Sequence, residues 1–178
     1  VIEAIIEQIK PKKALFAELD TICKPSTIFA SNTSGLSITE MASAVKRSGQ
    51  VIGMHFFNPV PVMRLVEIIR GEQTDEETFQ TAHTLAERFN KVAISVKEAP
   101  LFAVNRILTP MINEAIFVLD EGIASAEDID QGMMLGASHP IGPLALADLI
   151  GLDTMLFVAE TLYEETKDSK YRPAPLLK

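Results

Sequence analysis

A histidine and a glutamate, His55 and Glu67, have the types and the setting that acid–base chemistry requires. His55 lies near the end of an apolar run, residues 51–57, just before a proline-rich loop. Open α/β sheets present side chains to ligands at the carboxyl ends of such strands. Glu67 lies inside the next apolar run, residues 65–69, where a buried carboxylate needs a partner. A carboxylate beside an imidazole orients the ring and stabilises its charged form, as a general acid–base histidine requires.

The residue types around Glu67 also permit a simpler arrangement. In a surface strand Glu67 would point to water, and the sequence pattern alone leaves both arrangements open. The other two histidines are weaker candidates for chemistry, because His83 lies on a polar helix face and His139 precedes a proline in a turn.

The single cysteine, Cys23, excludes an internal disulfide, and no Cys/His cluster has the spacing of a metal site. We therefore expect no bound metal, a small buried role for Cys23, and a protein of the cytoplasm or an organelle matrix. No apolar stretch reaches the roughly 18 to 20 residues needed to cross a bilayer, and no signal-peptide pattern is present.

The composition is that of a folded globular protein, with 47% hydrophobic and 22% charged residues in a chain of 178. The formal net charge is -8, and no run of Lys and Arg alternates with aromatic residues. Nucleic acid is therefore not expected as a partner. A small anionic ligand would have to bind through local donors and individual lysines.

Apolar runs and helical periodicities alternate through the first 98 residues, the pattern of an α/β sheet. A polar loop, residues 31–35, follows the second expected strand, and Ser37 with Glu40 resembles a helix capping box. The expected strands lie within residues 1–6, 27–31, 51–57, 65–69 and 92–96, and the helices at 8–22, from 37, and at 75–89.

After Pro100 the pattern is helical only, so a domain boundary is expected near residue 99. The expected helices are 103–120, 125–134, 142–149 and 153–166. The fold class is thus an α/β domain over residues 1–98 followed by an all-α domain over residues 99–178.

Four separated segments, in this order along the chain, resemble the 3-hydroxyacyl-CoA dehydrogenase family, and most of all its bacterial members that act on 3-hydroxybutyryl-CoA. They are Ala30–Ser34, His55–Pro59 continuing through Leu65–Glu67, Val104–Arg106, and His139–Pro143 with Asp148–Asp153.

The resemblance implies a fold and an activity. The first domain would be the C-terminal part of a Rossmann-type, NAD-binding domain, and the second a helical domain that forms a homodimer. The activity would be oxidoreductase: interconversion of (S)-3-hydroxyacyl-CoA, above all 3-hydroxybutyryl-CoA, and 3-oxoacyl-CoA such as acetoacetyl-CoA. The cofactor would be NAD(H), with NADP(H) left open.

The same resemblance implies roles for individual residues. His55 would be the general acid/base and Glu67 its orienting partner, while Ser34 and Asn105 would hold the substrate's C3 oxygen and thioester region. Both are short neutral donors suited to such a task. Their alternative role, helix capping or a turn, is common for these residue types.

The cofactor contacts implied by the resemblance are Glu7, Lys12, Ser34 and Asn58. Asn58 would lie between the histidine and the nicotinamide, and Glu7 and Lys12 lie in the expected strand-to-helix turn near the start of the chain.

The sequence departs from the family pattern at a few positions. Gly35 stands where relatives usually have a second serine, and Ala103 replaces a larger residue. Leu101 stands where relatives usually have glycine. A leucine resists the positive φ that a glycine position can require, so this change bears on the turn before Asn105.

The chain contains no Gly-x-Gly-x-x-Gly loop and begins with Val1 rather than Met, so we expect it to be truncated at both ends. Two alternatives to an active enzyme follow: an inactive dimerising fragment, or a non-enzymatic binding module that lacks the phosphate-binding loop.

Overall fold

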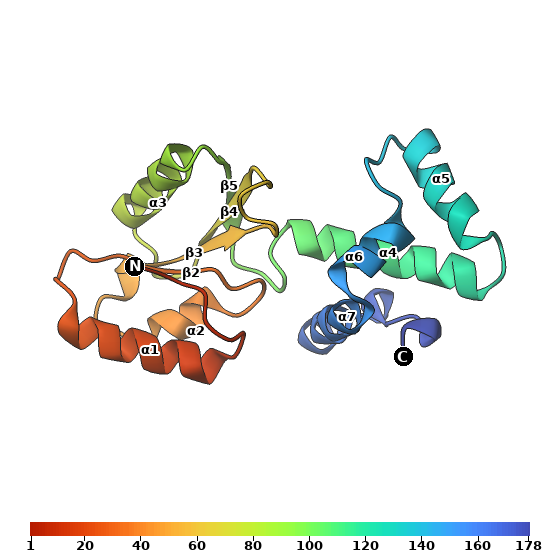
Figure 1. The fold of residues 1–178 in the computed structure, drawn as a ribbon. Coiled ribbons are helices and arrows are strands. Elements are labelled where there is room, and N and C mark those ends of the chain that lie inside the picture. Colours follow the sequence, from red (N-terminus) through yellow and green to blue (C-terminus); the bar gives the residue numbers. More distant parts are fainter. The chain divides into compact units, whose positions relative to one another are not determined.

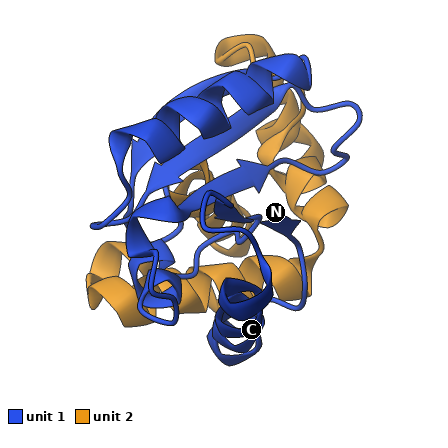
Figure 2. Ribbon diagram, turned by 90° about the vertical axis from the view of Figure 1, so that its left-hand side faces the viewer, with its two compact units in different colours: residues 1–102 blue, residues 103–178 orange.

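A computed structural model describes all residues of the chain, Val1–Lys178. They form two compact units, Val1–Phe102 and Ala103–Lys178, which Figure 2 shows in different colours. The first unit combines a sheet with helices and the second is helical, as expected. Residues 99–102 lie with the first unit, so the break falls a little after the expected position near residue 99.

A five-stranded, mostly parallel sheet forms the centre of the first unit, with the strands in the order β1-β2-β3-β4-β5. Strands β1, β2 and β3 are parallel, β4 runs antiparallel to β3, and β5 is parallel to β4. The bounds are β1 Ile2–Glu3, β2 Phe29–Ser31, β3 Val51–Phe56, β4 Leu65–Arg70 and β5 Val92–Lys97. The alternation of strands and helices predicted an α/β sheet, and the family resemblance implies the Rossmann-like arrangement that is observed.

Helices cover both faces of the sheet: α1 (Ile9–Ile22) and α2 (Ile38–Ala42) lie on one face and α3 (Glu76–Arg88) on the other (Figure 1). Side-chain caps fix two of the helix starts. Ser37 Oγ accepts from the backbone N–H of Glu40, as predicted, and Asp75 accepts from the backbone N–H of Thr78. Such caps satisfy backbone donors that the first helical turn leaves unpaired.

Alternation along β3 and β4 divides their side chains between the two faces. Ile52, Met54, Val66 and Ile68 pack with α3 in one buried cluster. The opposite face carries Gly53, His55, Glu67 and Ile69, on the side of α1 and α2. The side chains of His55 and Glu67 therefore project from the sheet face that α3 does not cover.

The second unit consists of α4 (Val104–Asp120), α5 (Ala126–Gly136), α6 (Pro143–Ile150) and α7 (Leu152–Thr166), followed by two short 3-10 turns. Its core is a cluster of buried apolar residues, Ile112, Ile116, Ala147, Met155 and Ala174. The buried Asn113 amide holds the C-terminal segment against α4, since Nδ2 donates to Arg172 O at 3.0 Å and Oδ1 accepts from Ala174 N at 2.7 Å.

None of these helices combines the length and the apolar character that a membrane span requires.

The tight packing around Gly53, between Ile69 of β4 and Ile38 of α2, yields a prediction. A methyl group added there would lie 2.8 Å from Ile69 Cβ and 3.0 Å from Ile38 Cδ1. Gly53→Ala should therefore lower the free energy of unfolding by about 1–3 kcal/mol, the usual cost of overpacking. Urea denaturation followed by circular dichroism measures this change.

The matched control is Gly132→Ala in α5, where an added methyl group meets nothing within 4 Å. It should raise stability by up to ~1 kcal/mol, because alanine is the better helix former. If the two alanine variants behaved alike, the close packing of Ile69 and Ile38 around Gly53 would be refuted.

Candidate active site

The register of the β3–β4 ladder places His55 directly opposite Glu67. Facing residues of an antiparallel pair have Cβ atoms about 4.5–5.5 Å apart, close enough for their side chains to meet. His55 Nδ1 lies 2.8 Å from Glu67 Oε2, a hydrogen-bonding distance. Glu67 is fully buried, so the alternative in which it points to water from a surface strand is wrong.

The pair is enclosed by aromatic rings. His55 is only 4% exposed, and the rings of Phe57 and Phe102 have centroids 4.6 and 5.8 Å from the imidazole. Because Nδ1 is engaged by the carboxylate, Nε2 is the nitrogen that can exchange a proton with a ligand. This geometry is that of an oriented acid–base histidine.

The polar loop that follows β2 is tied to the strand that carries His55. Asn32 Oδ1 accepts from the backbone N–H of Phe56 at 2.9 Å, so the loop lies beside the carboxyl end of β3. Thr33 is buried, and its Oγ1 accepts from the backbone N–H groups of Gly35 and Leu36. Ser34 is exposed at the tip of this loop.

Glu7, in the turn between β1 and α1, supports the same loop from the other side. Its Oε1 accepts from the Ser34 backbone N–H at 2.8 Å and from Thr33 Oγ1 at 2.5 Å. Its Oε2 lies 3.4 Å from Lys12 Nζ. Glu7 is still 39% exposed in its side chain, so it can also face a ligand.

Lys12 lies beneath the loop rather than on its surface, with the residue 1% exposed. Its ammonium group is 3.0 Å from both carboxylate oxygens of Glu3 and 3.2 Å from Ile5 O. Ser31 Oγ also donates to Glu3 Oε1. These contacts direct the donors of Lys12 at Glu3, Ile5 and Glu7.

Models of one protein family match both units of the chain. The model described as "3-hydroxyacyl-CoA dehydrogenase, NAD binding domain" matches residues 1–99, and the one described as "3-hydroxyacyl-CoA dehydrogenase, C-terminal domain" matches residues 102–178. The chain belongs to the 3-hydroxyacyl-CoA dehydrogenase family. The resemblance drawn from the sequence segments is thereby confirmed.

Individual relatives agree with this family assignment. The chain is 56% identical over 177 residues to the 3-hydroxybutyryl-CoA dehydrogenase of Clostridioides difficile, covering 99% of this chain and 63% of that protein. It is 57% identical over 178 residues to the probable 3-hydroxybutyryl-CoA dehydrogenase of Bacillus subtilis (strain 168), covering 100% of this chain and 62% of that protein.

A crystal structure of (S)-3-hydroxybutyryl-CoA dehydrogenase from Ralstonia eutropha superimposes with a TM-score of 0.96 at 56% identity, covering 99% of this chain and 62% of that chain. The chain therefore spans less than two thirds of the length of the relatives that it matches.

The remaining residues that the family resemblance singles out belong to different units of the chain. Asn58 is exposed just after β3, at the strand end that carries His55. Asn105 is the second residue of α4 in the helical unit and is partly buried. Neither Ser34 nor Asn105 is a helix cap: Ser37 caps α2, and the position before α4 is Ala103.

Two features at this site escaped the sequence analysis. Glu3, the buried partner of Lys12, sits in an apolar run where a carboxylate signals a pairing, but the run does not say with what. The aromatic enclosure of His55 by Phe102 depends on the chain folding back after β5.

Residue 101, where the family resemblance implies a glycine, adopts a left-handed backbone conformation. Leu101 has a φ of 57° and Phe102 a φ of 59°. For L-amino acids this conformation costs roughly 1–2 kcal/mol per residue, so the expected resistance of leucine is overcome by its surroundings.

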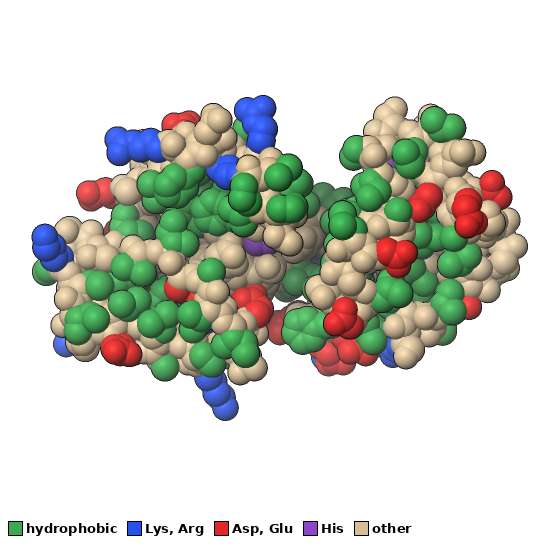
Figure 3. All heavy atoms as spheres, in the orientation of Figure 1, with side chains coloured by type: hydrophobic (Ala, Val, Ile, Leu, Met, Phe, Trp, Pro, Cys, Tyr) green, Lys and Arg blue, Asp and Glu red, His purple; other side chains and the backbone are tan.

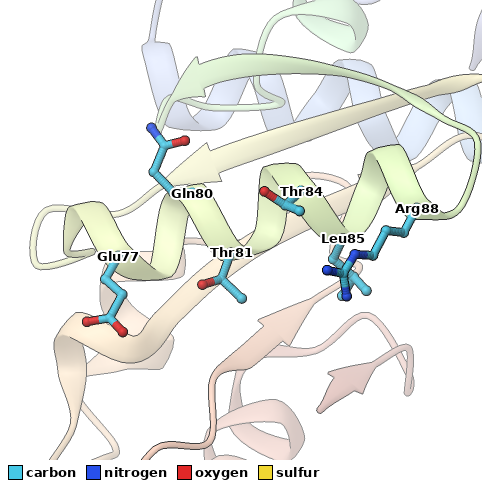
Figure 4. A pocket seen from close by; sticks show the side chains of 6 residues that line it. All are labelled: Glu77, Gln80, Thr81, Thr84, Leu85 and Arg88. Atoms are coloured by element: carbon cyan, nitrogen blue, oxygen red, sulfur yellow. The ribbon is translucent and has the colours of Figure 1, made fainter.

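A shallow surface depression elsewhere in the first unit lacks the features of an active site. All of its lining residues come from α3: Glu77, Gln80, Thr81, Thr84, Leu85 and Arg88 (Figure 4). It is the exposed, mostly polar face of one helix and holds no nucleophile and no histidine. No group of three or more His, Cys, Asp or Glu side chains in the chain is arranged to hold a metal ion.

The His55–Glu67 contact predicts which tautomer the neutral imidazole adopts. An ionised carboxylate can only accept, so Nδ1 should carry the hydrogen and Nε2 should be unprotonated. Nitrogen-15 NMR of the ring reports this directly. Glu67→Gln should weaken the preference, because an amide both donates and accepts.

His83 is the internal reference for that measurement. Its Nδ1 lies 3.5 Å from Glu87 Oε1 on an exposed helix face, so a mixture of tautomers is expected there. A His55 spectrum dominated by the Nε2-protonated tautomer would contradict the pairing.

Proposed function

We propose that the protein containing this chain interconverts (S)-3-hydroxyacyl-CoA and 3-oxoacyl-CoA by hydride transfer with NAD(H). The observation that carries this proposal is the buried His55–Glu67 pair, with Nδ1 held at 2.8 Å and Nε2 left for a substrate. The names of the relatives support 3-hydroxybutyryl-CoA and acetoacetyl-CoA as the substrate pair.

His55 moves the proton in this reaction. In the oxidation direction Nε2 accepts the proton of the C3 hydroxyl while the C3–H bond breaks and the C3=O double bond forms. The hydride lost from C3 is taken up by the nicotinamide, which is the chemistry the cofactor supplies when bound. In reduction the imidazolium returns a proton to the oxygen at C3 as the C–H bond forms.

Glu67 orients the ring and stabilises the imidazolium without taking the proton itself. Its place in the middle of β4 means that the carboxylate cannot swing away, and the histidine is held with it. A preorganised pair of this kind needs little rearrangement during the reaction.

Ser34 and Asn105 are proposed to contact the substrate's C3 oxygen and thioester region. For Ser34 the support is its exposure at the end of a loop anchored to the His55 strand and to Glu7. For Asn105 the support is the family resemblance together with its freedom from a capping role.

The residues of this chain fit the nicotinamide end of NAD. Ser34, Asn58 and Glu7 bring exposed hydroxyl, amide and carboxylate groups, and Ser34 and Asn58 follow neighbouring strand ends. Their hydrogen-bonding capacity suits a ribose and a carboxamide. The description of the matching family model supports NAD over NADP.

We also propose a homodimer formed through the helical unit. Large apolar side chains are exposed there, and Figure 3 shows hydrophobic patches on this unit among acidic side chains. Contiguous exposed apolar surface marks interaction sites. A second copy is the favoured partner, since helical domains of the family are expected to dimerise. The most exposed of these residues are Leu135, Leu149, Ile107, Ile123 and Phe157.

We place the protein in the cytoplasm and expect no nucleic-acid partner. The supporting observations are the single free cysteine, Cys23, and a formal net charge of -8.

Replacement of His55 tests the proposed activity on the full-length protein. His55→Gln should lower kcat for acetoacetyl-CoA reduction by about 10²- to 10⁴-fold, the usual contribution of a general acid–base group. Loss of NADH absorbance gives the rate, with NADPH measured alongside. Binding of the CoA ester should change little.

His83→Gln is the matched control and should retain the parent rate, since His83 lies on α3 away from the pair. Unchanged turnover of His55→Gln would overturn the role of His55. An inactive full-length parent would favour the alternative of a dimerising or binding module.

Charged substitutions test the dimer. Three single variants each place a carboxylate at an exposed apolar position of the helical unit. They are Leu135→Glu, Leu149→Glu and Phe157→Glu, at residues that are 79%, 75% and 62% exposed. At least one should shift the sedimenting species toward monomer, because an interface core disfavours an unpaired charge.

Ile22→Glu, at a 71% exposed position of the first unit, should leave the dimer intact. A monomeric parent, or three glutamate variants that all stay dimeric, would rule out this surface.

A further inference from the structure

The segment after β5 folds back onto the first unit and ends in two buried left-handed residues. Leu101 is 4% and Phe102 2% exposed, and their φ values are 57° and 59°. Neither is a glycine, so the local sequence does not favour this backbone. Such conformations persist where the surrounding structure fixes them, often at functional sites.

Leu101 occupies the space that a side chain at residue 35 would need. A Cβ built on Gly35 would lie 2.7 Å from Leu101 Cδ2, 3.7 Å from its Cα and 3.8 Å from its Cγ. The leucine side chain therefore rests directly on the Gly35 backbone. Gly35 is the residue after Ser34, so this contact reaches the loop that carries the proposed substrate donor.

The loop is thus held from two directions. On one side Glu7 accepts from the Ser34 backbone N–H at 2.8 Å. On the other side Leu101 packs on Gly35, while the next residue, Phe102, lies with its ring 5.8 Å from the His55 ring. One short turn therefore touches both the loop of Ser34 and the imidazole.

We propose that Leu101 is a positioning residue, which together with Gly35 forms a matched pair that holds the loop of Ser34 in place. The expected effect on turnover rests on the proposed function. The contact between Leu101 and Gly35 rests on packing alone. A side chain at residue 35 displaces Leu101, and loss of the Leu101 side chain leaves a void against Gly35. When both changes are made, the new side chain at residue 35 fills the void left by Leu101.

A double-mutant cycle on the full-length protein tests the pair. Gly35→Ser and Leu101→Gly should each lower kcat about tenfold or more with a smaller change in KM, since small misplacements of reacting groups can cost up to about 10² in rate. The double variant should return to within roughly threefold of the parent, because neighbouring sites are not additive. Gly35→Ala with Leu101→Ala repeats the cycle with smaller changes.

Asn90→Gly is the matched control. Asn90 also has a left-handed φ, 59°, but it lies just after α3, the helix on the sheet face opposite to His55. It separates the general effect of glycine at such a position from the effect at Leu101, and its kcat should equal that of the parent.

The kcat values test the positioning role of Leu101, and the urea midpoints test its contact with Gly35 separately. Additive losses in kcat, or a Gly35→Ser variant with parental kcat, would overturn the positioning role. Urea midpoints of the same four proteins report the pairing without reference to activity. If the parent shows no dehydrogenase activity, non-additive midpoints still support the matched pair, and additive midpoints remove it.

Discussion

Glu67 is a fully buried carboxylate in the middle of a strand, and it therefore requires a hydrogen-bonding partner that the first unit has to provide. Taking an ionised group out of water is costly unless a charged or donating partner is hydrogen-bonded to it. The partner, His55, comes from the neighbouring strand at the facing position of the ladder. A shift of one residue in register would turn the two side chains to opposite faces of the sheet and break the pair.

This requirement accounts for the one reversal of strand direction beside β3. A parallel neighbour needs a long crossover, whereas an antiparallel one can be reached by a short connection. The loop of residues 57–64 makes that connection between β3 and β4. Glu67 therefore returns to the level of His55 within a short stretch of sequence, and Asn58 is placed at the strand end where His55 lies.

A second set of buried charges supports the neighbouring loop in a similar way. Lys12 is held by Glu3 and in turn holds Glu7, which binds the backbone of Ser34. Replacing such a buried pair by apolar residues is often neutral or favourable for stability, so stability alone does not explain it. Here the network fixes the direction of a loop, a task that apolar packing performs less specifically. Lys12 thus acts on this loop through its contact with Glu7.

Local patterns predicted most of the helices and strands, because apolar periodicity, caps and prolines act within a few residues. Ser37 and Ser125 mark the starts of helices in the structure as the sequence indicated. The pairing of His55 with Glu67 was one of two arrangements that the sequence left open, because a carboxylate in an apolar run either finds a partner or faces water. The pairing of Glu3 with Lys12 could not be anticipated, since it depends on how the turn after β1 closes.

The turn at Leu101 shows why a departure from a family pattern has to be judged in three dimensions. Considered by itself, a leucine in a glycine-like position predicts a poor fit, and its backbone does adopt the unfavourable left-handed region. Gly35 is another of the three departures, and in the structure Leu101 and Gly35 are in contact. Leu101 fills the space that a side chain at residue 35 would occupy, so the packing beside this loop is complete. The backbone cost at Leu101 is then offset by burial of its side chain and that of Phe102, and what is preserved is the contact between them and the site.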